Sequence, residues 1–189
     1  LRTPGSEWQH DVALSQGMID ARVVLRLDPI RKLLELAGDP SNPTAEELAE
    51  LFDRTETIAV IGLSRDPDKT AQQVPSYLAS KSYDVIPVNP DANRILGKKG
   101  YNTISDVPQS VDLVVIFRPS DKAGRFVTES GRRSERPAIW LQEGIWAKPE
   151  IEAVRAEGLT AVQNMCTYRV HRFLNAGNGA PTGPSLGKS

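Results

Sequence analysis

The strongest constraint on the fold is a series of short, largely apolar runs that recur between residues 57 and 162. Each run holds four to seven residues, many of them β-branched. The runs are Thr57 to Leu63, Asp84 to Val88, Leu113 to Phe117, Pro137 to Leu141 and Leu159 to Val162. Runs of this kind are typical of strands that are buried on both faces of a sheet.

Segments with a helical pattern lie between the later runs, at Ser120 to Arg133 and Pro149 to Glu157. Strands that alternate with helices pair in parallel through right-handed crossovers. We therefore predict an α/β fold, a Rossmann-like three-layer sandwich around a mainly parallel sheet of about five strands.

Two further helices are expected before the first strand. Asp28-Pro29 is typical of an N-cap and first turn, and the apolar pattern that follows stops at Gly38. Thr44 to Glu47 has the form of a capping box, which predicts the start of a second helix. The sequence thus predicts an N-terminal extension at residues 1–53, a main domain at 54–174 and a flexible tail at 175–189, where small and polar residues dominate.

Composition limits the partners and the compartment. The chain has 23 Lys and Arg against 24 Asp and Glu, so no overall field would attract nucleic acid or an anionic membrane, and we expect neither partner. Cys166 is the only cysteine, which excludes an internal disulfide and a multi-cysteine zinc site and fits a reducing compartment, so we expect a cytoplasmic protein. A homo-oligomer is left open.

No segment of the sequence is expected to act as a membrane span or as an N-terminal signal peptide. The longest apolar runs hold about seven residues, against the roughly twenty that span a bilayer. The first residues lack the order of a signal peptide. Leu1 is not a natural initiator, so we expect an N-terminus that is either trimmed or not native, and we leave residues 1–16 out of the fold prediction.

The carboxyl ends of the predicted strands indicate where a ligand binds, because crevices in open α/β sheets lie at that edge. The first strand ends in Gly62-Leu63-Ser64, and Lys69 stands just before a helix expected to begin between Thr70 and Pro75. Thr70 to Gln73 resembles a capping box. A glycine, a hydroxyl and a cation beside a helix start favour a phosphate group.

Two common nucleotide sites are disfavoured by the same loops. A dinucleotide fingerprint needs three spaced glycines and an acidic residue at the end of the second strand, whereas this strand ends in Val88-Asn89-Pro90. The only candidate for a P-loop, Gly97-Lys98-Lys99, lacks the upstream glycine and the following Ser or Thr. NAD and ATP are therefore less favoured than another phosphorylated ligand.

The chain resembles the CoA-binding domain proteins, which are related to the nucleotide-binding domain of the succinyl-CoA synthetase alpha subunit. The resemblance covers about Glu56 to Phe173. It is carried by Ile58 to Ser64 with Lys69, Tyr83 to Pro90, Leu96-Gly97 with Tyr101, Pro108, Val111-Asp112, Phe117-Arg118, Trp140 to Gly144 and Asn164 to Cys166. Two positions depart from the family pattern: Ala71 stands where many relatives have serine, and Asn164-Met165 replaces an Asp-Arg pair.

This resemblance implies that the cofactor is coenzyme A. Its phosphates would meet the loop from Gly62 to Thr70, and its adenosine end would contact the strand tips. The predicted ligand-binding residues are Gly62, Leu63, Ser64, Lys69, Thr70, Val88, Asn89, Pro90, Phe117 and Arg118.

No arrangement of residues predicts a catalyst. A cysteine nucleophile needs an adjacent base, and Cys166 is expected to be a buried or merely reduced thiol. His171 is expected at the surface of the final basic segment, and Glu143 is left out of the site. We therefore favour a non-catalytic protein that binds CoA or acyl-CoA. The alternatives are a small nucleotide- or CoA-dependent enzyme, or a protein-interaction module on the same fold.

Overall fold

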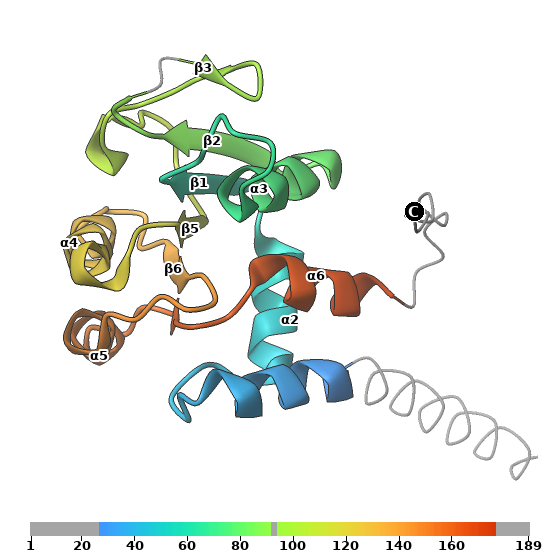
Figure 1. Ribbon diagram of the computed structural model, residues 1–189. Helices are drawn as coiled ribbons and strands as arrows, with labels where there is room; N and C mark the ends of the chain where they lie inside the picture. Colours follow the sequence, from blue (N-terminus) through green and yellow to red (C-terminus); the bar gives the residue numbers. More distant parts are fainter. Residues whose placement is uncertain (1–26, 92–93, 177–189) are drawn as a thin grey trace, which may run out of the picture.

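The computed structural model describes residues 27–91 and 94–176, which form an α/β sandwich around a five-stranded sheet (Figure 1). The strand order is β2-β1-β5-β6-β7, and all four pairs are parallel. The strands are β1 (Thr57–Ile61), β2 (Asp84–Val88), β5 (Leu113–Ile116), β6 (Ala138–Leu141) and β7 (Ala161–Val162). The predicted Rossmann-like fold with about five parallel strands is confirmed.

Helices cover both faces of the sheet. They are α2 (Ala45–Arg54), α3 (Thr70–Ser80), α4 (Ser120–Gly131), α5 (Lys148–Ala156), α6 (Thr167–Asn175) and a helical stretch at residues 27–37. A small hairpin of β3 (Arg94–Ile95) and β4 (Lys98–Lys99) and the 3-10 helix η1 (Ile104–Asp106) lie between β2 and β5.

Successive strand residues enter two separate hydrophobic clusters, because side chains alternate between the faces of a strand. In β1, Ile58 and Val60 pack in the cluster that includes residues of α2, α3, α6 and the helix at 27–37. Ala59 and Ile61 pack in the cluster that includes residues of α4 and α5. This double burial explains why the strands are apolar throughout.

The two N-terminal helices differ in how well their starts were predicted. The capping box of α2 is present: Glu47 N–H donates to Thr44 Oγ1 over 3.2 Å, and Thr44 N–H donates to a Glu47 carboxylate oxygen over 2.7 Å. The other helix is already formed at residue 27, so the predicted N-cap at Asp28 is wrong. The Asp28 carboxylate instead accepts from Arg31 Nη1 over 2.7 Å.

A polar network bonds the turn before α2 to the end of β7. The Asn42 side chain accepts from Gln163 N–H over 2.9 Å and donates to Gln163 O over 3.0 Å. Asp39 accepts from Arg155 over 3.0 Å and from the Gln163 side chain over 2.7 Å. Burial alone would raise the pKa of Asp39, but hydrogen bonds from Gln163, Ser41 and Arg155 lower it below its usual value. The side chains of Asp39 and Asn42 therefore hold the turn against the end of β7.

Residues of the N-terminal helices and of the strands share one hydrophobic cluster. The boundary between residues 53 and 54 stays a prediction. The predicted tail lies outside the described residues from residue 177 onward, and residues 1–26 of the extension also lie outside them. Within the described ranges, no helix combines the length and the apolar character needed to cross a bilayer.

We predict that Asn42→Ala lowers the free energy of unfolding by about 2–3 kcal/mol. The change removes two hydrogen bonds to backbone groups of Gln163 and one from Arg155, and each net bond contributes roughly 0.5–1.5 kcal/mol. Urea unfolding followed by circular dichroism measures the loss. The neighbouring Ser41→Ala is the control, because Ser41 is exposed and should change stability by less than about 0.5 kcal/mol. Equal stability of Asn42→Ala and the parent would show that the network is not needed.

The predicted surface position of His171 is wrong. Its side chain is only 4% exposed, because α6 turns one face onto α3 and α2. His171 Nδ1 lies 3.0 Å from the Tyr77 hydroxyl, and its ring packs at 5.3 Å from the rings of both Phe52 and Tyr83. Burial, with a smaller contribution from Lys81, lowers the pKa of His171 to about 4.

We predict a loss of stability on acidification that depends on His171. Because its pKa is lowered in the folded state, the unfolded chain binds more protons between about pH 6.5 and pH 4, so stability is full above this window and falls within it. The loss between pH 7.5 and pH 5 should be roughly 2 kcal/mol. Urea unfolding at both values should show a smaller loss for His171→Gln than for the parent. The only other histidine supplies the control, since His10→Gln should keep the parent's loss; an unchanged loss in His171→Gln would contradict the prediction.

Candidate functional site

The carboxyl ends of β2, β1 and β5 lie next to one another in the sheet (Figure 1), and the predicted site residues lie at or directly after these ends or, for Lys69 and Thr70, stand at the start of α3. β1 and β5 are neighbours, but the helices that follow them leave to opposite faces: α3 packs in one hydrophobic cluster and α4 in the other. The place where neighbouring connections leave to opposite faces is the switch point of the sheet, and open α/β sheets hold ligands there.

Gly62 allows the tips of β1 and β5 to approach. Its φ is +87°, and a Cβ atom there would lie 2.5 Å from the Phe117 carbonyl oxygen and 3.0 Å from Arg118 Nε. Gly62 N–H donates to Val88 O over 2.9 Å, and Phe117 N–H donates to Ile61 O over 2.8 Å. Only glycine fits this position, and its presence brings Arg118 directly against the backbone of the first loop.

The loop between β1 and α3 is held by its own backbone. Pro75 lies inside α3 and has no N–H for the Ala71 carbonyl one turn earlier, and this carbonyl accepts from Ser64 N–H over 3.1 Å instead. Ser64 Oγ accepts from Asp66 N–H over 3.0 Å. The proline thus frees an acceptor that fastens the loop to the helix.

Helix α3 begins at Thr70, within the predicted interval, but the predicted capping box is wrong. Lys69 is the N-cap residue, and no side chain caps the helix. The Lys69 side chain is 66% exposed, with Nζ 3.8 Å from an Asp66 carboxylate oxygen. Because an exposed ion pair of this length is weak, the ammonium group is available to an anion at the start of α3.

Asn89 organises the second tip. Its side chain donates to Leu63 O over 2.9 Å and accepts from Asp91 N–H over 3.0 Å. Leu63 and Val88 are buried, and the carbonyls of both accept bonds within the tips. The predicted ligand contacts of Leu63, Val88 and Asn89 stay predictions, and all three residues shape the edge on which a ligand would lie.

A cleft of about 620 Å³ opens beside these tips, between the segment after β2, the residues just before η1 and the length of α4. Its lining is Pro90, Asp91, Asn102, Thr103, Arg118, Pro119, Lys122, Arg125, Phe126 and Glu129. Pro90 and Arg118 are the only predicted site residues among them. Lys122 and Arg125 were missed, although spacings of four and three residues along the predicted helix at 120–133 put them near Arg118 on one face.

Arg118 holds the most distinctive polar atom of the site. Within residues 27–91 and 94–176, three buried side-chain nitrogen or oxygen atoms have no hydrogen-bond partner: Arg118 Nε and the hydroxyls of Ser76 and Ser130. A buried charged donor without a partner costs free energy. The following helix α4 has no side-chain cap either. An anion placed here would therefore find a guanidinium donor and a free helix N-terminus.

The candidate nucleophile Cys166 is a poor thiolate. It precedes α6 and is partly buried, and burial raises the pKa of the thiol despite backbone hydrogen bonds and the nearby Arg169. Arg169 instead pairs with Glu143 over 2.9 Å. His171, the one histidine of the described residues, faces Tyr77. The described residues therefore provide Cys166 with no histidine base.

Known proteins resemble this chain in sequence and in structure. The family model described as "CoA binding domain" matches residues 56–172. The uncharacterized protein YneT of Bacillus subtilis is 30% identical over 130 residues, which are 69% of this chain and 96% of that protein. An ADP-forming acetate–CoA ligase II of Archaeoglobus fulgidus is 30% identical over 103 residues, 53% of this chain but only 15% of the ligase. A hypothetical protein from Pyrococcus horikoshii has a similar structure, with a TM-score of 0.66, 30% identity and coverage of 70% of this chain and 92% of the other.

Proposed function

Because the chain belongs to the CoA-binding domain family, we propose that it binds coenzyme A or an acyl-CoA at the switch point without catalysing a reaction on it. The observation that carries the proposal is Arg118 Nε, which is buried without a partner against Gly62. A phosphate oxygen beside Gly62 would satisfy this donor.

The charges of the site match a ligand with two separated phosphate groups. Lys69 stands at the uncapped start of α3, and Arg118 and Lys122 flank the uncapped start of α4. Coenzyme A carries a pyrophosphate and a separate phosphate on its ribose, so each helix start would receive one anionic group. The pyrophosphate would lie at the Gly62 loop, and the adenosine end would extend toward Pro90 and the cleft.

NAD suits this site less well. The residues at the end of β2, Val88, Asn89 and Pro90, provide no carboxylate for the ribose hydroxyls, and the Asn89 side chain is already bonded to Leu63 and Asp91. NAD also lacks the second, separate phosphate that the cations near α4 would contact.

The proposal that no reaction is catalysed rests on Cys166 and its surroundings. Thioester cleavage needs an activated nucleophile together with donors for the oxyanion. The raised pKa keeps the Cys166 thiol protonated, and Glu143 is engaged by Arg169. A stand-alone domain of this kind would sense, store or deliver its ligand.

We predict that Arg118→Met weakens CoA binding ten- to a hundredfold, since a hydrogen bond to a charged group contributes about 1.5–3 kcal/mol. Isothermal titration calorimetry of the purified chain with CoA measures the change. Methionine keeps an unbranched apolar stem, so the fold should survive. Titrations with NAD and ATP should give much weaker binding.

The matched control is Arg132→Met. Arg132 is exposed at the far end of α4, about 18 Å from the helix start at 1.5 Å per residue, and its loss should leave the affinity unchanged. Equal weakening by both variants would mean that Arg118 acts only through overall charge. An absence of CoA binding to the parent would overturn the proposed function.

We also predict that acetyl-CoA incubated with the protein releases free thiol at no more than the uncatalysed rate. A thiol reagent followed by absorbance measures the release, in the parent and in Cys166→Ser. Turnover in the parent that disappears in Cys166→Ser would establish a cysteine enzyme and contradict the non-catalytic proposal.

A further inference from the structure

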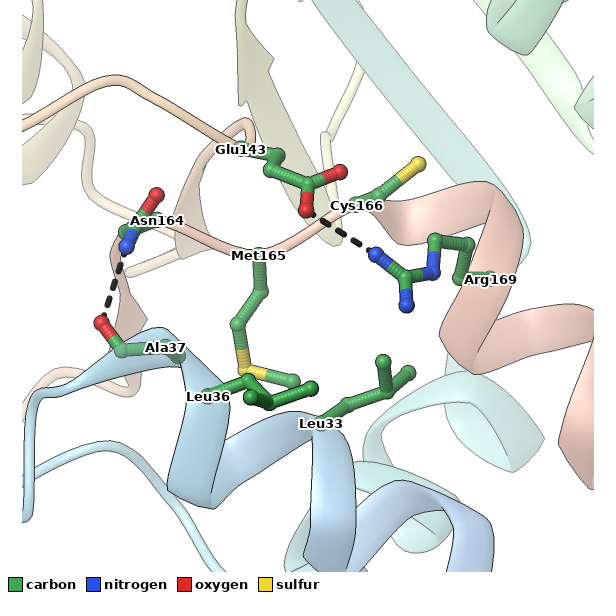
Figure 2. A pocket seen from close by; sticks show the side chains of 8 residues that line it. All are labelled: Leu33, Leu36, Ala37, Glu143, Asn164, Met165, Cys166 and Arg169. Atoms are coloured by element: carbon green, nitrogen blue, oxygen red, sulfur yellow. Dashed lines mark hydrogen bonds and ion pairs between the residues drawn. The ribbon is translucent and has the colours of Figure 1, made fainter.

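A second hollow opens on the carboxyl edge of the sheet, away from the switch point (Figure 2). It has a volume of about 60 Å³ and lies between the helix at 27–37 and the segments that follow β6 and β7. The residues that matter here are Leu33, Leu36, Glu143, Met165, Cys166 and Arg169. Leu33 and Leu36 lie outside residues 56–172, so the side of the hollow formed by the helix at 27–37 is not covered by the family model.

The floor of the hollow is apolar. Figure 2 shows the Met165 side chain reaching toward Leu33 and Leu36, while the Cys166 sulfur points away from them. Leu33 and Met165 are buried, but Leu36 is 71% exposed and is the one large apolar side chain exposed to this degree in the described residues. An apolar group resting on Leu36 would remove its surface from water.

Hydrogen bonds of Asn164 hold the segments around the hollow together. The Asn164 side chain donates to Ala37 O over 2.8 Å and accepts from Gly144 N–H over 2.6 Å, which fastens the helix at 27–37 to both loops. The exposed pair of Glu143 and Arg169 lies on the side opposite the helix (Figure 2). Arg169 thus brings N–H donors to the rim of an apolar hollow.

The distance from the phosphate loop fits the length of the CoA arm. β1 and β7 are separated by three strand intervals, or about 14 Å at 4.7–4.9 Å per interval. The arm between the pyrophosphate and the sulfur of CoA has about thirteen bonds. An extended chain spans about 3.3–3.6 Å for every three bonds, so the extended arm is roughly 15 Å long. A ligand with its pyrophosphate at Gly62 can therefore bring its sulfur to this hollow.

We propose that the hollow receives the acyl group of a short acyl-CoA of about two or three carbons, an inference that rests on the proposed binding of CoA. A single water needs about 10–15 Å³ of free volume on this measure, so 60 Å³ holds a group of about four non-hydrogen atoms but not a fatty acyl chain. The acyl carbons lie on Leu33, Leu36 and Met165, and Arg169 at the rim can donate to the thioester carbonyl. The acyl group stays intact, because no bond is broken at this site.

Calorimetric titration of the parent with CoA, acetyl-CoA, propionyl-CoA and octanoyl-CoA tests the inference. Affinity should rise about fourfold for each buried carbon up to propionyl-CoA, and octanoyl-CoA should bind no better than propionyl-CoA. Leu36→Ala should leave the affinity for CoA unchanged and should reduce the increase in affinity from CoA to propionyl-CoA. Because Leu36 is exposed and alanine favours helices, this variant should fold.

The control variant is Glu35→Ala, a neighbouring exposed position on the same helix, which should keep the parent's rise. Equal affinities for CoA, acetyl-CoA and propionyl-CoA in the parent would overturn the inference and leave CoA binding intact. An undiminished increase in affinity from CoA to propionyl-CoA in Leu36→Ala would also overturn the inference and leave CoA binding intact. Failure of the parent to bind CoA or any acyl-CoA would overturn the proposed function itself.

Methyl NMR gives a second, independent readout. The chain has two methionines, Met18 and Met165, so ¹³C-methyl labelling gives two signals that Met18→Leu assigns. The Met165 signal should shift on saturation with propionyl-CoA by clearly more than with CoA. Identical shifts with both ligands would contradict an acyl group on Met165.

Discussion

The approach of two strand tips at Gly62 is the contact on which the rest of the site depends. The Gly62 N–H donates to Val88 O of β2. The preceding residue, Ile61 at the end of β1, accepts through its carbonyl oxygen from the N–H of Phe117, which follows β5. A single Cβ atom here would meet the Phe117 carbonyl at 2.5 Å and push away Arg118. The absence of one side chain therefore sets the spacing of three tips and the position of the main cation.

The elements that local signals specify could be predicted from the sequence. Strands buried on both faces must be apolar at every position, so they stand out without any knowledge of their partners. β2 was predicted with both ends correct, and β5 and β6 to within one residue, because proline or charged residues bound these runs. The carboxyl edge followed from the parallel order, and with it the place of Gly62 and Arg118.

What depends on distant contacts could not be predicted. The burial of His171 requires Tyr77, 94 residues earlier, and nothing in the basic segment around it indicates that partner. The bonds of Asn42 reach 121 residues along the chain to Gln163. Even the local capping signal at Thr70 failed: Thr70 is the first residue of the helix, and Lys69 takes the N-cap position without a side-chain cap. The cleft cations Lys122 and Arg125 could have been found from helical spacing once Arg118 was placed.

The network around Asn42 has a consequence for self-association. β7 ends the sheet, and the outward groups of such a strand ordinarily invite a strand from a second molecule. Here Asn42 occupies both backbone groups of Gln163, and Arg155 occupies the Ala161 carbonyl. On the opposite border, Tyr101 exchanges backbone bonds with Pro87 and Asn89. Both edges of the described sheet therefore offer few free backbone groups to a strand from a second copy of this chain, which disfavours edge-to-edge joining of two sheets.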